Sequence, residues 1–449
     1  MKRFEIHTHS DVSNTRLLDS IISVEDLIDK AVEIGLVGVC LTDHECLSNL
    51  PAASFYGEKI REEHPDFKVA LGNEIYLCDT RDMNQKYYHF ILIAKNATGW
   101  RALRELSSLA WLNSYWDRGM ERVVTLKEDL ERIVRKYPNC LIATTACLGG
   151  ELSTLVDQML NAEAMFDIDT RATKHQEIIN FVQWCKSLFG QDFYIECAPA
   201  ASRDQIRVNK KLINIADVFG IKMVIGSDAH YLSKEDRYVH KSYLNSKGGE
   251  REVDSFYEYS YLQSEAEIRE NLGKSYNEDV INWMFENSME IYDKIDNYDI
   301  RHQQRIPKIA VKYYPKTNTL YEEQEKYPIL YDMTQSDNDI ERYWVTECLL
   351  KLKELGKDND TYLARLEEEA DIKRTISEKL NTNMFAYPVT LQHYIDLFWE
   401  CGSMVGAGRG SSCSGLNHYL LGVTQLDPIE WDLPFWRYLN KERVELGSL

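Results

Sequence analysis

Two short motifs far apart in the chain each carry two side chains that can bind a metal ion. They are His7-Thr-His9 and Asp228-Ala-His230, and each one ends an apolar stretch. On a strand, side chains two residues apart point to the same face, so each motif would present both of its ligands together. Two strands that each end in such a pair predict one metal site at the rim of a barrel.

Other side chains that can bind metal ions recur near the ends of further apolar segments. They are His44, Glu74, Cys147, Asp19 in the loop after the first segment, and His89, which precedes its segment. In α/β barrels the functional groups cluster at the carboxyl ends of the strands. Imidazole, carboxylate and thiolate ligands together suit zinc, manganese or iron better than magnesium, and so many ligands indicate two or three ions. Clustered divalent ions suit phosphoester hydrolysis, because they activate water, hold a phosphate and stabilise the leaving oxygen.

Simpler interpretations exist for single residues of these types. We expect the isolated histidines to be surface or core residues without a role; these are His64, His175, His240, His302 and His393. Cys147 taken alone would be a core thiol. Asp43 would either support a ligand or cap a strand end. A whole series of such side chains at strand ends is hard to reach by chance, which favours the metal site.

The elements that would position these residues are short apolar segments alternating with helix-like ones. We expect strands at Phe4–Thr8, Leu36–Thr42, Val69–Leu77, Phe90–Ala94, Cys140–Thr145, Phe193–Cys197 and Met223–Ser227. They are apolar almost throughout, as strands buried on both faces should be. The first helix has a capping-box pattern from Ser23 to Asp26 and a stop at Gly35. Seven strands with helices between them predict a parallel α/β barrel.

Composition limits the class of protein further. The 449 residues suggest about two to four domains at roughly 100–200 residues each. Lys and Arg number 52 against 72 Asp and Glu, a net charge of −20, which argues against non-specific nucleic-acid binding by the whole surface. The ten cysteines lack a C-x-x-C pair, and no secretory leader begins the chain, so we expect a reduced, cytoplasmic protein. No apolar stretch approaches the roughly 18 residues that span a bilayer, so no membrane partner is expected.

The second half of the chain contains a glycine-rich segment, Gly406-Ala-Gly-Arg-Gly-Ser-Ser-Cys-Ser-Gly415. Glycines let the backbone approach a phosphate closely, and successive amides favour anions. Arg409 would add a fork of donors, and Ser411 and Ser412 would add hydroxyls. An ordinary glycine turn is the alternative. Helices are expected before this segment, at 343–355 and 363–379, with a linker near 302–316.

The ordered motifs of the first half resemble the polymerase and histidinol phosphatase (PHP) domain. They are His7-Thr-His9-Ser10, Leu17-Leu-Asp19-Ser20, Thr42-Asp-His44, Gly72-x-Glu74, His89–Ala94, Ala146-Cys147-Leu-Gly-Gly150 and Ser227–Leu232. The match is to the version at the amino terminus of the bacterial replicative DNA polymerase III alpha subunit, of the C family. It implies a trinuclear centre with the ligands His7, His9, Asp19, His44, Glu74, His89, Cys147, Asp228 and His230. It also implies a metal-dependent 3′→5′ exonuclease suited to proofreading, with Asp228 and His230 in the catalytic machinery.

Residues 400–445 resemble the palm of the same polymerase family. The resemblance implies that the triphosphate of the incoming dNTP is held by Gly408, Arg409, Gly410, Ser411 and Ser412. In the family, the segment equivalent to 440–444 is followed by Pro-Asp-x-Asp, whose aspartates bind two magnesium ions. This chain instead reads Val444-Glu-Leu-Gly-Ser-Leu449. We therefore expect that polymerisation needs a second fragment carrying the catalytic carboxylates, thumb and fingers, and the contact with any sliding clamp.

The sequence thus predicts an α/β protein in two parts. Residues 1–270 would form a PHP-type (β/α)7 barrel, and residues 271–449 a mixed α+β first segment of a polymerase palm. The predicted function is that of the amino-terminal fragment of a replicative polymerase, truncated or split, acting on DNA primer-template and dNTP. Two alternatives stay open: a small-molecule phosphoesterase using the same metals, and a non-enzymatic scaffold for a partner polymerase fragment.

Overall fold

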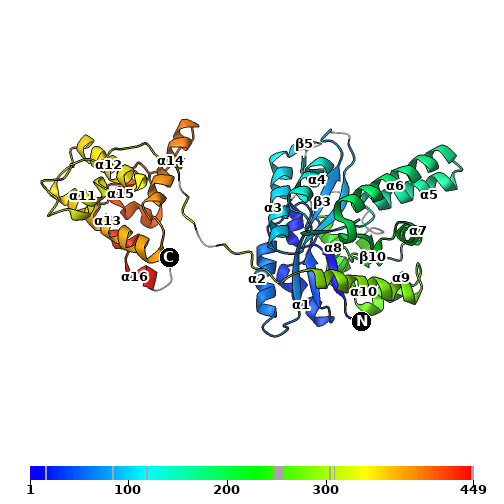
Figure 1. The fold of residues 1–449 in the computed structure, drawn as a ribbon. Coiled ribbons are helices and arrows are strands. Elements are labelled where there is room, and N and C mark those ends of the chain that lie inside the picture. The colour runs from blue at the N-terminus through cyan, green and yellow to red at the C-terminus, as the bar shows by residue number, and fades with distance from the viewer. Residues whose placement is uncertain are drawn as a thin grey trace. The chain divides into compact units, whose positions relative to one another are not determined.

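The computed structural model describes residues 1–15, 18–82, 85–117, 120–246, 257–302, 305–307 and 309–445 (Figure 1). The chain divides into two compact units, Met1–Arg301 and His302–Leu449. This division lies after the expected boundary at 270, because α10 (Glu278–Lys294) packs on the sheet of the first unit. There the Asn287 side chain donates to the Met223 carbonyl at 2.8 Å. Leu17 and residues 446–449, which belong to two of the predicted motifs, lie outside the described residues.

One curved sheet forms the centre of the first unit. Its strands run in the order β1 (Phe4–Thr8), β2 (Gly38–Leu41), β3 (Lys68–Cys78), β4 (Tyr88–Ala94), β8 (Leu141–Thr144), β9 (Phe193–Cys197) and β10 (Lys222–Ile225), and β7 (Thr125–Leu126) pairs with β3. The two ends of the sheet meet at one rim. The His9 amide donates to the Ala229 carbonyl at 2.9 Å, and the Ala229 amide donates to the His7 carbonyl at 3.3 Å. The predicted α/β class and PHP-type barrel are confirmed.

The barrel differs from the prediction in the direction of one strand. β4 is antiparallel to both of its neighbours, β3 and β8, whereas the other neighbouring strands of the ring pair in parallel. The connection from Cys78 to Tyr88 is too short for a crossover between parallel strands, which needs a dozen or more residues. Because β4 runs the other way, its first residues lie at the rim where the other strands end. His89, expected just before this strand, is the second residue of β4, and the reversed direction explains how it reaches the rim from the start of a strand.

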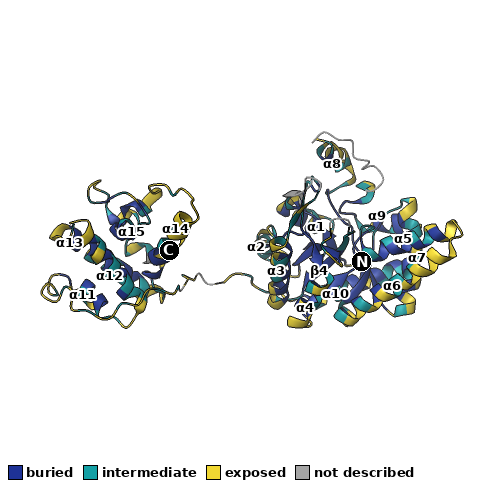
Figure 2. Ribbon diagram, turned by 90° about the horizontal axis from the view of Figure 1, so that it is seen from above, coloured by how far each residue is buried: buried dark blue, intermediate teal, exposed yellow. Residues whose placement is uncertain are grey.

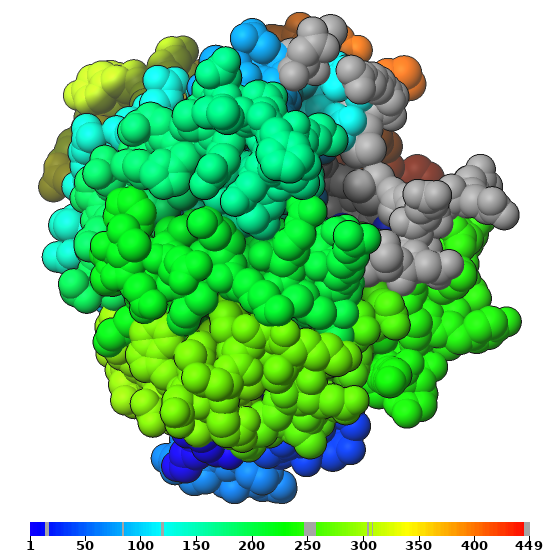
Figure 3. Space-filling view, turned by 90° about the vertical axis from the view of Figure 1, so that its right-hand side faces the viewer, coloured from blue at the N-terminus to red at the C-terminus, as the bar shows by residue number. Residues whose placement is uncertain are grey.

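Most helices of the first unit pack around the sheet and bury their apolar faces against it (Figure 2). They are α1 (Val24–Glu33), α2 (Leu50–Ile60), α3 (Ala97–Leu112), α4 (Lys127–Lys136), α5 (Glu151–Ala164), α6 (Ile168–Phe189), α7 (Arg203–Phe219), α9 (Glu265–Leu272) and α10. The short α8 (Arg237–Leu244) is not among them and buries His240 and Leu244, while β5 (Tyr115–Asp117) and β6 (Met120–Arg122) form a separate hairpin. Figure 3 shows one face of the first unit, with α5, α6 and α7 above α9 and α10. The predicted cap of α1 is present, because the Asp26 amide donates to the Ser23 hydroxyl at 3.1 Å. All ten cysteines fall within the described residues and are free thiols, and only Cys401 is exposed.

The second unit is built from helices. They are α11 (Pro328–Thr334), α12 (Asp339–Glu354), α13 (Asp360–Leu380), α14 (Ala386–Glu400), α15 (Leu416–Leu420) and α16 (Glu442–Glu445), with the 3-10 helices η5 (Gly410–Ser414) and η6 (Phe435–Arg437). The described residues after His302 contain no strand, so the mixed α+β structure expected for this part is not found there. The reason is periodicity: Trp344, Cys348 and Leu352 recur at helical spacing and face one apolar core. Over the described part of the chain, no helix combines the length and the apolar character that crossing a membrane requires.

Candidate metal centre

Eight of the nine predicted ligands converge at the rim where the sheet closes. They form three overlapping groups, each with ligand atoms within 4.8 Å of one another: His9, Asp19, His44 and His230; His7, His9, Glu74 and Asp228; and His44, Glu74 and His89. These residues come from segments more than two hundred residues apart. The curvature of the sheet is what brings them together.

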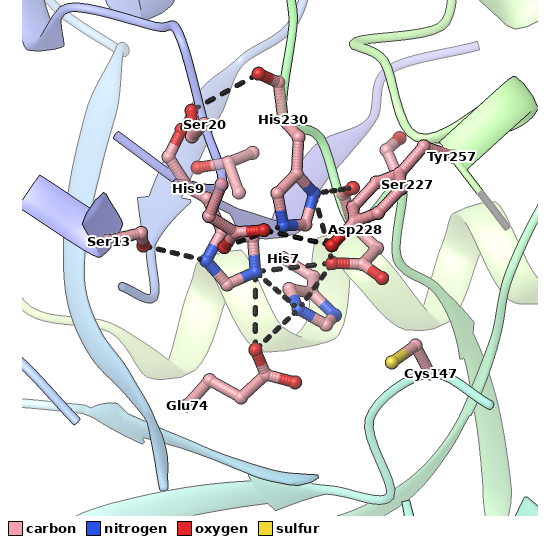
Figure 4. A network of polar contacts seen from close by, with 12 residues as sticks. His7, His9, Ser13, Ser20, Glu74, Cys147, Ser227, Asp228, His230 and Tyr257 are labelled. Carbon is pink, nitrogen blue, oxygen red and sulfur yellow. Dashed lines mark hydrogen bonds and ion pairs between the residues drawn. The ribbon is translucent and has the colours of Figure 1, made fainter. Parts of the chain in front are cut away.

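The two motifs at the ends of β1 and β10 meet as their spacing predicts. The Nε2 atoms of His7 and His9 each lie 3.2 Å from Asp228 Oδ1 (Figure 4). The intervening Thr8 and Ala229 instead join the two strands through the backbone. Asp228 has a φ of 48°, in the left-handed region that few residues other than glycine adopt. Such a conformation at a ligand position suggests that the fold holds the carboxylate where the site needs it.

Glu74 lies at the centre of the cluster. Its Oε2 is 2.7 Å from His44 Nδ1, 3.3 Å from His9 Nε2 and 3.6 Å from His7 Nε2. Its Oε1 is 2.7 Å from His89 Nδ1, on the strand that runs in reverse. Both oxygens are buried, and within the described residues no hydroxyl, amide or guanidinium donates to them. Glu74 would therefore hold a divalent cation together with the histidines around it, and its charge would help to neutralise that cation.

Asp19 holds the other side of the cluster. Its Oδ2 lies 3.0 Å from His44 Nε2 and 3.1 Å from His230 Nε2, and its Oδ1 accepts from the Tyr257 hydroxyl at 3.0 Å. The Nδ1 of His230 donates to the Asp228 carbonyl at 2.8 Å. This bond places the proton on Nδ1, so Nε2 is the nitrogen that would bind a metal ion.

Cys147 lies at the edge of the site and outside the three groups. Its sulfur is 3.6 Å from His89 Nδ1 and accepts from the Gly149 amide at 3.4 Å. Burial raises the pKa of the Cys147 thiol well above its ordinary value, and the charges of Asp228 and Glu74 raise it further. A bound cation would act in the opposite direction and favour the thiolate.

The charges of the site fit divalent cations. Burial opposes protonation of His7, but Glu196, Asp228 and Glu74 outweigh it and hold the pKa of His7 well above its usual value. Conversely, burial favours protonation of Asp228, but His7 and His230 lower its pKa. The carboxylates therefore favour positive charge in the site. Without metal ions, this positive charge comes from protons on the imidazoles. Together with the nitrogen, oxygen and sulfur donors, this fits the predicted class of ions.

Two residues that the sequence did not identify as part of the site hold its ligands in place. Glu196 is buried in β9, and its Oε1 lies 2.5 Å from His7 Nδ1, so the Nε2 of His7 faces the cluster. His240, expected to have no role, donates from Nε2 to the Asp19 carbonyl at 2.7 Å. The detectable signal for Glu196 was an acidic residue inside an otherwise apolar strand, which requires a buried partner.

Asp43, for which two roles were open, supports a ligand. It accepts from the Ser10 amide at 2.6 Å and from the Ser10 and Ser13 hydroxyls, each at 2.7 Å. The Ser13 hydroxyl also lies 3.1 Å from His9 Nδ1. Asp43 therefore orients His9 through Ser13.

The predicted nucleotide-binding residues lie in the second unit, in the loop between α14 and α15. Gly408, Arg409, Gly410 and Ser411 are exposed, and Ser412 is half-buried in the middle of η5. The Ser412 hydroxyl donates to the Arg409 carbonyl at 2.9 Å. The loop thus presents its backbone and the Arg409 side chain to solvent, as an anion site would require.

Comparison with known proteins agrees with both parts. Residues 5–200 match the PHP domain, and residues 338–447 match the bacterial DNA polymerase III alpha NTPase domain. The chain resembles the DNA polymerase III alpha subunit. A DNA-directed DNA polymerase of Bacillus phage SPbeta is 40% identical over 99% of this chain and 36% of that protein. The DNA polymerase III subunit alpha of Borreliella burgdorferi is 27% identical over 98% of this chain and 34% of that protein.

The resemblance expected from the motifs is confirmed, and the chain spans about a third of the length of these relatives. Among solved structures, a protein assigned as a metal-dependent phosphoesterase from Bifidobacterium adolescentis aligns with a TM-score of 0.31 and 14% identity. That alignment covers 62% of this chain and 98% of the other.

Proposed function

We propose that this chain is the amino-terminal part of a replicative DNA polymerase of the polymerase III alpha type, with a PHP barrel that acts as a 3′→5′ exonuclease. The observation that carries the proposal is the convergence of eight metal-capable side chains at one rim of the barrel. Similarity to DNA polymerases along nearly the whole chain supports the setting in replication.

The barrel would hold two or three divalent ions, zinc, manganese or iron. The ligands would be His7, His9, Asp19, His44, Glu74, His89, Cys147, Asp228 and His230. When bound, such ions activate water and stabilise the charge that develops on a phosphodiester. The chain itself orients the ligands: Glu196 fixes the His7 ring, and Ser13 with Asp43 fixes the His9 ring. Asp228 and His230 would form the part of the site nearest the reacting phosphate.

In the second unit, the loop from Gly408 to Ser412 would bind the triphosphate of an incoming dNTP beside a DNA primer-template. Magnesium-dependent nucleotidyl transfer also needs carboxylates to hold the ions. We propose that these carboxylates, with the thumb, the fingers and any contact with a sliding clamp, are supplied by sequence outside these 449 residues. That sequence would belong either to the same protein or to a partner fragment.

The test is a gel assay with a 5′-labelled primer on a template, in manganese or zinc, with and without deoxynucleotides. We expect stepwise shortening without extension, lost in Asp228→Asn and kept in Asp204→Asn, a matched change at an exposed residue of α7. Faster hydrolysis of phosphomonoesters than of single-stranded DNA would indicate the small-molecule phosphoesterase instead. Absence of hydrolysis, with only a loss of thermal stability in Asp228→Asn, would indicate the scaffold.

A further inference from the structure

The glycine-rich loop is exposed to solvent on one side, and on the other side it contacts the rest of the second unit. Its Ala407 carbonyl accepts from the Gln425 amide at 2.7 Å. At Gly408, where φ is +135°, a side chain would place its Cβ only 2.7 Å from the Cys413 sulfur. The segment is therefore packed against the rest of the unit at Ala407 and at Gly408, where the backbone conformation and the lack of space favour glycine.

A single carboxylate holds the end of the loop. Glu369, on α13, is fully buried. Its Oε1 accepts from the Leu416 amide at 2.7 Å, and its Oε2 accepts from the backbone and side-chain amides of Asn417 at 3.0 and 2.6 Å. These are the first residues of α15, whose amides have no partners within the helix. Glu369 thus caps α15 from a neighbouring helix and fixes where the loop ends.

Two further side chains hold the carbonyls of the loop. Arg365, one turn before Glu369, donates to the Ser414 carbonyl at 2.7 Å and to Glu369 Oε1 at 3.1 Å. The buried His418 donates from Nδ1 to the Ser412 carbonyl at 2.9 Å, and burial lowers the pKa of His418 to about 3, so this ring stays neutral. Glu369, Arg365 and His418 thus hold the loop through its backbone and do not use the exposed side chains. The exposed Arg409, Gly410 and Ser411 are left to face a ligand.

The same face of α13 carries a third charged residue. Lys373 lies one turn after Glu369 and is also fully buried. Arg365, Glu369 and Lys373 thus place two cationic groups and one carboxylate beneath the loop, at a spacing of four residues. Burying charges is costly, and an apolar contact would hold the helices together at least as well. Stability alone therefore does not explain why charged residues stand at these three positions.

We propose that Glu369, held by Arg365, is a positioning residue that fixes the glycine-rich loop in the shape that receives a triphosphate. This rests on the proposed function of the loop and adds what sets its geometry. A loop ordered before binding does not lose conformational freedom on binding, so affinity rises without new contacts to the ligand. The flanking cations Arg365 and Lys373 offset the charge of the carboxylate, which would otherwise repel an anion.

The experiment measures binding of inorganic tripolyphosphate and of dATP to the full chain by titration calorimetry. Glu369→Gln keeps the shape of the side chain and removes its charge, and we expect both probes to bind about tenfold more weakly, the loss of one oriented charged contact. Glu378→Gln, at an exposed position near the end of α13, should bind both probes like the unaltered chain. The titrations are run at a temperature where the buried Cys348 thiol of every variant stays protected from alkylation, which shows that the unit is folded.

A double change separates positioning from simple loss of structure. If Glu369 acts by placing Arg409, then Glu369→Gln should weaken binding much less in an Arg409→Ala background than in the unaltered chain. Unchanged affinity in a folded Glu369→Gln variant, or equal losses in both backgrounds, would overturn the positioning role alone. Failure of Arg409→Ala to weaken binding, or no binding by the unaltered chain, would overturn the proposed function of the loop as well.

Discussion

Replacement of Lys373 by methionine should stabilise the second unit by about 3 kcal/mol at pH 7. Lys373 is fully buried in α13, and within the described residues its Nζ has no hydrogen-bond partner. Burial lowers the pKa of Lys373 to about 8, and the nearby Glu369 only partly offsets this effect. Methionine has a similar length and no charge, so it should fill the same space.

The magnitude follows from the difference in pKa between the folded and unfolded chains. The pKa of lysine is about 10.4 in an unfolded chain and about 8 for Lys373 in the folded protein. Each pKa unit corresponds to about 1.4 kcal/mol, so the difference destabilises the folded state by about 3 kcal/mol while the lysine is charged. Below pH 8 the buried charge of Lys373 destabilises the second unit by this full amount. Between about pH 8 and 10.4 the folded lysine loses its proton while the unfolded one keeps it, so the stability of the unaltered chain rises with pH. At pH 9.5 the gain from methionine should shrink to about 1 kcal/mol.

The assay is urea unfolding at pH 7 and pH 9.5, read from alkylation of the Cys348 thiol and mapped by mass spectrometry. Cys348 is buried in the core of the second unit, so it reports the unfolding of that unit and not of the barrel. Lys353→Met, at an exposed position of α12, is the matched control and should change little. The reasoning would be refuted if Lys373→Met did not raise the free energy of unfolding at pH 7, or if it raised it by the same amount at pH 9.5.

Four further outcomes concern the barrel. Glu196→Gln should weaken zinc or manganese binding about 10–100-fold, because Glu196 orients the His7 ring, and calorimetry on the metal-free protein would measure this. Cys147→Ser should weaken zinc binding while Cys185→Ser, at a buried thiol of α6, leaves it unchanged; equal effects would mean that Cys147 is only a core thiol. Chelation should abolish nuclease activity and lower the melting temperature of the barrel. In the metal-free barrel, the pKa of His7 is raised above its value in the unfolded chain. The stability that protonated His7 contributes is therefore complete below about pH 6.5 and is lost as the pH rises through the folded pKa. The melting temperature of the metal-free barrel, measured across about pH 5–9, should fall as the pH rises.

The capacity of this chain for metal chemistry could be predicted because it depends on local pattern. Ligand spacing of two residues on a strand fixes which side chains share a face, so the pairs ending β1 and β10 were predicted without knowledge of the fold. Amphipathic spacing at 343–355 likewise predicted α12, and a charge-rich helix was expected at 363–379, where α13 lies. The glycine-rich segment was recognisable because its backbone freedom is a property of the residues themselves.

Other features depend on contacts between distant residues. The direction of β4 places His89 at the rim, and the closing bridge between Thr8 and Ala229 brings Asp228 to His7. The support from Glu196 to His7 spans 189 residues, and the capping of α15 by Glu369 crosses from one helix to another. Neither has a spacing that a sequence pattern can reveal. The residue types predicted which side chains could hold metal ions and anions. Closure of the sheet and packing of the helices decided which buried groups hold those residues in place, because burial and orientation arise only when distant segments meet.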